Sequence, residues 1–217
     1  MVRWLASHSS RSWAYENVTI IEAHFVPRSS SVLVLTTEHS LIRHDRVAGS
    51  FTTIDTAVFG PISLDEVGRS VVYTRGEPPE LRVVQAKIAT ATTHVLDDRL
   101  YPSWCPTLSA DGESIVFVAS PDGDAHFYRS TANSQPELWN LPPSTPLPTG
   151  PTAPVWSDRP RTYESDGTLY TLSDDGTVDR AMEGLGLPIH PAGSNRVIVQ
   201  NRQLQMLELP IRPGVVR

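Results

Sequence analysis

Carboxylates are the side chains whose chemistry we consider first, because paired Asp and Glu residues act as acid, base or nucleophile in glycoside hydrolysis. The candidates are Asp158, on a predicted inner strand, and Glu22, Asp55 and Asp98, near the entrances of such strands. They are few, and the residues around them on those strands are mostly uncharged. Glycosidase activity is therefore the enzymatic alternative, and the sequence favours a chain that is not an enzyme.

Metal and nucleotide chemistry have less support. Cys105 is the single cysteine. The histidines other than His190 show no paired metal-ligand spacing; they are His8, His24, His39, His44, His94 and His126. Four Asp-Gly steps lack the carboxylate series of a calcium loop and are instead favoured in tight hairpin turns. No phosphate loop or dinucleotide fingerprint is present. We expect no metal and no cofactor.

The candidate carboxylates and histidines must be held by regular elements, and the sequence offers short β-branched or aromatic runs for this. Each run is bounded by turn residues, and the runs lie at 31–37, 70–74, 114–120 and 196–200. The chain has 19 prolines and 13 glycines, which oppose long helices. The sequence therefore predicts an all-β fold.

A repeated motif precedes these runs, in which a small residue or proline stands two positions before a ring. The rings are Phe25, Phe59, Trp104, Trp156 and His190, spaced 34, 45, 52 and 34 residues apart. Such spacing is typical of β-propeller blades with unequal loops. We interpret the rings as structural wedges between blades rather than as stacking sites for a ligand.

Further strands complete each repeat. Third strands are predicted at 40–47, 80–86, 125–131, 168–173 and 203–209. Fourth strands are predicted at 50–55, 93–98, 137–141 and 177–182. The last repeat has no fourth strand, and we expect residues 12–20 to supply it and close the ring. We expect a single domain over 1–217 that consists of five four-stranded blades. The first four blades span about 21–55, 56–98, 99–142 and 143–183, and the fifth combines 184–217 with 12–20.

The third repeat, over 99–142, resembles the TolB-like (WD-type) β-propeller repeats. The matching residues are Pro102, Trp104, Pro106, Asp111, Gly112, Ile115, Phe117, Asp122, Gly123 and Tyr128. The second and fourth repeats match at fewer positions. The resemblance implies that the ring and the proline lie on the innermost strand and its turn, where they serve packing.

Propeller domains generally bind partners on one face, through the loops that enter the inner strands and those that join the second and third strands. Arg and Tyr are enriched at the centres of protein interfaces. The candidate partner-binding residues in these loops are Arg75, Glu77, Asp98, Arg99, Tyr101, Asp122, Asp124 and Arg202. We expect a non-catalytic scaffold that docks in a larger assembly, with a lectin-like glycan-binding propeller as the alternative.

The composition narrows the class of partner. The net charge is −6, and no block of basic residues is present, so we expect no nucleic-acid partner. The chain contains neither a signal-peptide pattern nor a run of apolar residues long enough to enter a membrane. A cytoplasmic or assembly-associated location is the expectation.

Overall fold

Every element of the described chain is a strand. The computed structural model describes residues 2–3, 12–13, 19–131, 134–148, 155–156, 161–166, 168–173, 175–182, 189–191, 196–200 and 206–210. All strand pairs are antiparallel, and in the sheets of three or four strands each strand pairs with its neighbours in the sequence. The prediction of an all-β chain is confirmed.

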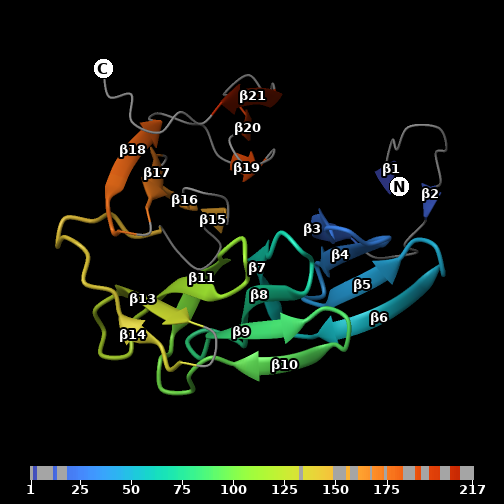
Figure 1. Ribbon diagram of the computed structural model, residues 1–217, viewed down its shortest axis with the longest axis horizontal. Helices are drawn as coiled ribbons and strands as arrows, with labels where there is room; N and C mark the ends of the chain where they lie inside the picture. The colour runs from blue at the N-terminus through green and yellow to red at the C-terminus, as the bar shows by residue number, and fades with distance from the viewer. Residues whose placement is uncertain are drawn as a thin grey trace.

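Four sheets are four-stranded and follow one another along the chain (Figure 1). The first contains β3 (Ile20–Phe25), β4 (Ser31–Thr36), β5 (Leu41–Asp45) and β6 (Ser50–Asp55). The second contains β7 (Val58–Leu64), β8 (Ser70–Arg75), β9 (Arg82–Lys87) and β10 (Thr92–Val95). The third contains β11 (Ser103–Leu108), β12 (Ser114–Ala119), β13 (His126–Thr131) and β14 (Glu137–Leu138). The fourth contains β15 (Val155–Trp156), β16 (Arg161–Ser165), β17 (Thr168–Leu172) and β18 (Val178–Met182).

The remaining strands form two smaller sheets. A three-stranded sheet contains β19 (Ile189–Pro191), β20 (Arg196–Gln200) and β21 (Met206–Pro210). A two-stranded sheet pairs β1 (Val2–Arg3) with β2 (Ser12–Trp13). The expected closing strand over 12–20 does not appear in the described pairing. Ser12 and Trp13 pair with β1, and Ile20 already belongs to the first sheet.

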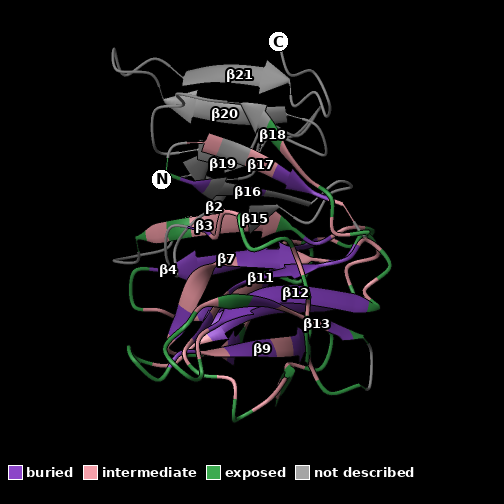
Figure 2. Ribbon diagram, turned by 90° about the vertical axis from the view of Figure 1, so that its left-hand side faces the viewer, coloured by how far each residue is buried: buried purple, intermediate pink, exposed green. Residues whose placement is uncertain are grey.

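The second strand of a sheet is the most deeply buried. Every residue of β4 and of β12 is buried, including the serine at the start of each strand. A strand covered on both faces loses the alternation of polar and apolar residues, which explains the continuous apolar runs in the sequence. Figure 2 shows the buried inner strands and the exposed loops around them.

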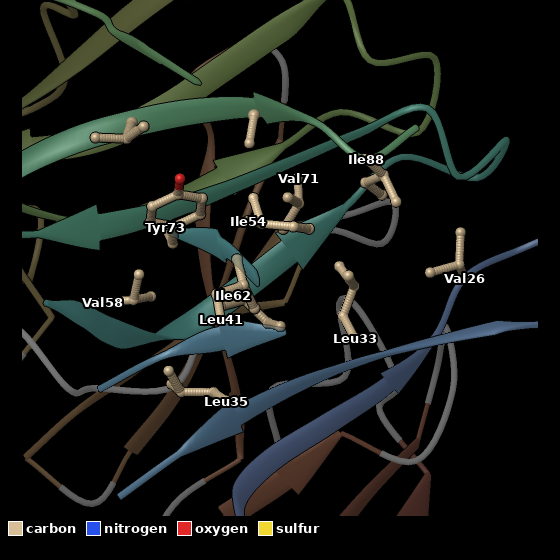
Figure 3. Close-up of a cluster of buried hydrophobic side chains, with 12 residues drawn as sticks. Val26, Leu33, Leu35, Leu41, Ile54, Val58, Ile62, Val71, Tyr73 and Ile88 are labelled. Atoms are coloured by element: carbon tan, nitrogen blue, oxygen red, sulfur yellow. The ribbon is translucent and has the colours of Figure 1, made fainter. Parts of the chain in front are cut away.

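Apolar side chains fill the space between consecutive sheets. Leu33, Leu35 and Leu41 of the first sheet meet Val71 and Tyr73 of the second (Figure 3). A second cluster joins the second sheet to the third, and another joins the third sheet to the fourth. Each of the inner sheets therefore contributes to two cores, as stacked repeat units do.

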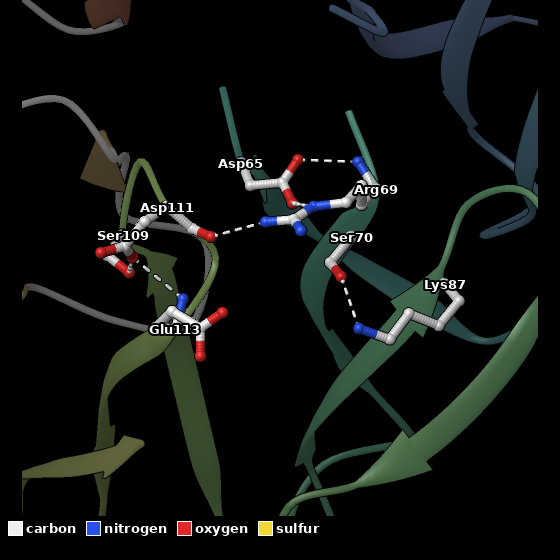
Figure 4. A network of polar contacts seen from close by, with 7 residues as sticks. All are labelled: Asp65, Arg69, Ser70, Lys87, Ser109, Asp111 and Glu113. Carbon is white, nitrogen blue, oxygen red and sulfur yellow. Dashed lines mark hydrogen bonds and ion pairs between the residues drawn. The ribbon is translucent and has the colours of Figure 1, made fainter. Parts of the chain in front are cut away.

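The turns between the first and second strands of each sheet also stack on one another. A Cβ on Gly68 would lie 2.6 Å from the carbonyl oxygen of Pro27 in the preceding sheet. A Cβ on Gly112 would lie 2.9 Å from Asp65 Oδ2. Arg69 donates to the carbonyl oxygen of Asp111 at 2.9 Å, which ties the second sheet to the third (Figure 4). Close packing between sheets, together with the positive φ of Gly68 and Gly112 (+75° and +78°), explains why these turns contain glycine.

Among the repeat rings with described side chains, Phe25 occupies a different place in the pairing register from Phe59 and Trp104. Phe59 pairs with Thr74 and Trp104 with Val118, each the fifth residue of its second strand. Phe25 pairs with Val32, the second residue of β4, and is 49% exposed. The proline that follows Phe25 lies in the hairpin turn, whereas Pro61 and Pro106 lie inside β7 and β11. Phe25 is therefore not the structural equivalent of the other two rings.

Candidate functional site

One edge of the stacked sheets collects the loops that the sequence singles out. In an antiparallel meander, the turn from the second to the third strand lies at the same end as the entry of the first strand and the exit of the fourth. The loops at this edge are 37–40, 56–57, 76–81, 96–102 and 120–125. We call this edge the entry edge.

Backbone hydrogen bonds hold neighbouring loops of the entry edge together. The Ser103 N–H donates to the carbonyl oxygen of Leu81 at 2.9 Å, and the Ser120 N–H donates to that of Pro102 at 3.0 Å. Ser103 is buried, and its Oγ accepts the Val83 N–H at 2.9 Å. Loops 76–81, 96–102 and 120–125 are thus fixed side by side, which provides a pre-organised surface.

Tyr101 and Arg82 form the most distinctive contact of the entry edge. The Arg82 guanidinium lies 4.8 Å from the centroid of the Tyr101 ring, a cation–π arrangement. Arg82 donates to the carbonyl oxygen of Glu80 at 2.9 Å, and its Nε lies 3.6 Å from Asp98 Oδ1. Tyr101 is 45% exposed. The ring is therefore held in place from one side while much of its surface stays open to solvent.

Arg99 is fixed next to this pair. It donates to Asp97 through both Nε and Nη2, at 3.0 and 2.7 Å, and to the side-chain oxygen of Gln135 at 3.2 Å. The hydrogen bonds from Arg99 hold the pKa of Asp97 below its ordinary value. Most of the Arg99 side chain is exposed. An exposed guanidinium with a defined orientation is a common feature of protein interfaces.

Arg75 is less available than its position in the sequence suggests. Its Nη1 donates to Asp55 Oδ2 at 3.0 Å, and the buried Tyr73 donates its hydroxyl to the same oxygen at 2.8 Å. Burial, with the Asp55 hydrogen bond, raises the pKa of Tyr73 above its ordinary value. Asp55 therefore ties the last strand of the first sheet to the second sheet.

The remaining candidate binding residues lie in exposed turns of the same edge. Glu77 is exposed in the turn before β9, and Asp122 and Asp124 are exposed in the turn before β13. Asp98 is 84% exposed. Arg202 lies outside the described residues. By loop position, every described candidate from Arg75 to Asp124 belongs to the entry edge. The Arg99 side chain also reaches Gln135 of the connection between β13 and β14.

The five rings of the repeated motif differ in their surroundings. Phe59 packs on the His39 ring with centroids 4.3 Å apart, and Trp104 packs into the cluster between the third and fourth sheets. The Arg46 guanidinium lies 5.2 Å from the centroid of the Phe25 ring. Trp156 and His190 lie on β15 and β19, and the structure describes only the backbone of these two residues.

The candidate carboxylates of a glycosidase are spread over different surroundings. Asp55 is held by Tyr73 and Arg75, whereas Asp98 is exposed in a loop. Glu22 contacts His24 and accepts the Ile62 N–H of the next sheet at 3.3 Å. Asp158 lies outside the described residues. In the part of the chain that the structure describes, no group of three or more His, Cys, Asp or Glu side chains is placed to hold a metal ion.

Sequence reasoning missed Arg82 as a site residue. It stands at the first position of β9, where an exposed loop residue and a strand residue look alike in sequence. The signal that could have found it is its position in Leu81-Arg82, immediately after the loop that holds Glu77 and Glu80. Its role depends on contacts with Asp98 and Tyr101, which lie in the loop between β10 and β11 and approach Arg82 only in the folded chain.

Sequential meander sheets that share their cores define the class of this fold, the β-propeller. Solved structures agree. A chain of a nidogen/laminin complex superposes with a TM-score of 0.61 at 18% identity, covering 88% of this chain and 76% of that one. TolB from Acinetobacter baumannii gives a TM-score of 0.61 at 13% identity, covering 97% of this chain and 59% of its own.

A third similar structure is the complex of KlAtg21 with the coiled-coil of AgAtg16. Its TM-score is 0.58 at 12% identity, covering 95% of this chain and 69% of that one. No protein-family model matches the chain, and no curated protein matches its sequence. The likeness therefore establishes a shared fold. Separately, nothing in the described part of the chain forms a helix that could span a lipid bilayer.

Proposed function

We propose that this chain is a non-catalytic, five-bladed propeller that docks on a protein partner within a larger assembly through its entry edge. The observation that carries the proposal is Tyr101, which stands half-exposed over a guanidinium that is itself fixed. A rigid aromatic loses little conformational entropy on binding, and Tyr and Arg dominate interface energetics.

Two proteins with a similar fold support the proposal of a protein partner. One belongs to a nidogen/laminin complex, and the other is KlAtg21 in complex with the coiled-coil of AgAtg16. Both show that propeller-like chains of this shape occur in protein complexes. Their identities to this chain are low, so the partner of this chain follows from its own residues.

The non-catalytic part of the proposal rests on how the carboxylates are used. The Asp55 carboxylate accepts two hydrogen bonds that join adjacent sheets, and the Glu22 carboxylate accepts a backbone N–H from the next sheet. A carboxylate that holds sheets together is not free to act as acid or nucleophile. Both groups therefore fit a structural role better than glycoside hydrolysis.

A glycan is the second candidate ligand, because an exposed aromatic beside the Asp98 carboxylate is also a sugar-stacking arrangement. The second sheet does not repeat this arrangement. The Gly76 N–H bonds to the carbonyl oxygen of Ala57 as the Ser120 N–H bonds to that of Pro102, so Thr56 is the equivalent of Tyr101. An aromatic platform that the second sheet lacks favours one protein partner over several equivalent sugar sites.

The experiment that tests the proposal is affinity capture from the native source with the full chain and a Tyr101→Ala variant. We expect wild type to retain a defined partner and Tyr101→Ala to bind it roughly thirtyfold more weakly, as for loss of an interface hot spot. Phe51→Ala is the control, because Phe51 is similarly exposed but lies on β6. Equal retention by Tyr101→Ala, or a lone monomer that binds only a glycan array, would overturn the proposal.

A further inference from the structure

The charges of the entry edge are unevenly compensated. Its arginines each contact a carboxylate: Arg75 contacts Asp55, Arg82 contacts Glu80 and Asp98, and Arg99 contacts Asp97. The entry edge also has carboxylates that do not pair with these arginines. Glu77, Asp122 and Asp124 are exposed, and none of them forms an ion pair within the described residues. The entry edge therefore has an excess of negative charge.

The opposite edge has a different charge pattern. This edge is formed by the loops that join the first strand to the second and the third strand to the fourth in each sheet. There Arg28, Arg46, Arg69 and Lys87 are interleaved with the acidic residues of the turns. Arg69 faces the buried Asp65, and Lys87 donates to Ser70 at 3.0 Å (Figure 4). Bases and acids thus alternate at one edge of the sheets, whereas carboxylates predominate at the other.

The acidic side chains of the entry edge come from loops that are fixed relative to one another. We call Glu77, Glu80, Asp98, Asp122 and Asp124 the acidic face. The Leu81–Ser103 and Pro102–Ser120 backbone hydrogen bonds join the three loops that carry them. The excess negative charge thus lies on the loop that carries Tyr101 and on the two loops joined to it. On such a pre-organised surface, complementary charge speeds association and selects the partner.

We propose that the acidic face docks a lysine- or arginine-rich segment of the partner protein, with Tyr101 as the anchor for an aliphatic stem or a guanidinium. This inference rests on the proposed function and adds the chemistry of the partner. Basic side chains match both features, because their charged ends pair with carboxylates and their stems or guanidinium planes pack on aromatic rings.

The test measures binding of a fluorescein-labelled lysine-rich peptide to the full chain by fluorescence anisotropy. The test variant combines Glu77→Gln, Asp122→Asn and Asp124→Asn. The matched control combines Glu66→Gln, Glu113→Gln and Glu137→Gln, which are exposed residues of the opposite edge. Both triple variants change the net charge equally, so that any difference between them reports the location of the charge.

We expect the test variant to bind the peptide roughly tenfold more weakly at low salt, with a shallower salt dependence, and the control to bind like wild type. Tyr101→Ala weakens binding further, whereas Tyr101→Phe keeps the ring and the affinity. Equal weakening by both triple variants, or equal binding of a glutamate-rich peptide, would overturn the proposal. A native partner lost with Tyr101→Ala but kept by the test variant would preserve the interaction role and refute only the basic chemistry.

Discussion

At the scale of residues, several charged groups join one sheet to the next. Asp55 shows the pattern most clearly, because a single carboxylate oxygen accepts from the buried Tyr73 and from Arg75. Buried polar groups need partners, and the loss of one partner exposes the full desolvation cost of the other. The carboxylate that sequence reasoning considered for catalysis therefore has a measurable structural role.

Replacing Asp55 by alanine should lower the free energy of unfolding by about 1–3 kcal/mol, because the Tyr73 hydroxyl is left buried without its acceptor. Urea denaturation followed by tryptophan fluorescence provides the measurement. Tyr73→Phe is the matched control, and it should cost about 1 kcal/mol because no orphaned group remains. If the double variant is as unstable as the two single changes added together, the two groups are not coupled and the interpretation fails.

The Asp97–Arg99 pair gives a pH dependence with a defined sign. The pKa of Asp97 is lowered in the folded chain, chiefly by the Arg99 hydrogen bond, so the pair stabilises the fold fully above the ordinary aspartate pKa of about 3.9. That contribution is lost as the pH falls through the lowered pKa. The stability difference between wild type and Asp97→Asn should therefore be constant near neutral pH and shrink in acid. A pH-independent difference would contradict this.

At the scale of elements, the turn glycines report how closely the sheets stack. Gly68 and Gly49 both have positive φ, +75° and +68°, but only Gly68 faces the backbone of another sheet. Alanine at Gly49 should cost about 1 kcal/mol through backbone strain alone. Gly68→Ala should cost roughly 1–3 kcal/mol more, because its Cβ would meet the Pro27 carbonyl. Thermal denaturation of both variants compares them, and equal losses would rule out close packing between the turns.

The strands could be predicted from the sequence where burial is continuous. The runs at 31–37 and 114–120 correspond to β4 and β12 within a residue or so, because both faces of these strands are covered. β16 was not predicted, since Arg161 and Glu164 interrupt its apolar pattern. The equivalence of Phe25 with the other rings was wrong for a related reason. Spacing along the chain does not reveal where a β-bulge lies.

The site could be predicted in outline only. Loop position placed Tyr101, Arg99 and Asp98 on one edge, because an antiparallel meander fixes which loops share an end. The pairing of Arg75 with Asp55 and of Arg82 with Tyr101 depends on how one sheet stacks on the next. Such contacts join residues of different sheets or loops, and no local pattern in the sequence indicates them.

At the scale of the whole molecule, shared cores should make the sheets unfold together. Cys105 is buried in the cluster between the third and fourth sheets, far from the core around Leu35. Leu35→Ala should cost about 2–5 kcal/mol and should accelerate labelling of Cys105 by a thiol reagent to the same extent as global unfolding. If labelling of Cys105 is unchanged in Leu35→Ala, the sheets open independently.

Site-specific photo-crosslinking in the native source can show whether a protein partner docks on the entry edge. Glu77 lies on the entry edge, in a loop joined to the one that carries Tyr101, whereas Glu66 lies on the opposite edge, and both residues are exposed. We expect a defined crosslinked protein from position 77 and none from position 66. Equal crosslinking from both positions, or from position 66 alone, would contradict it.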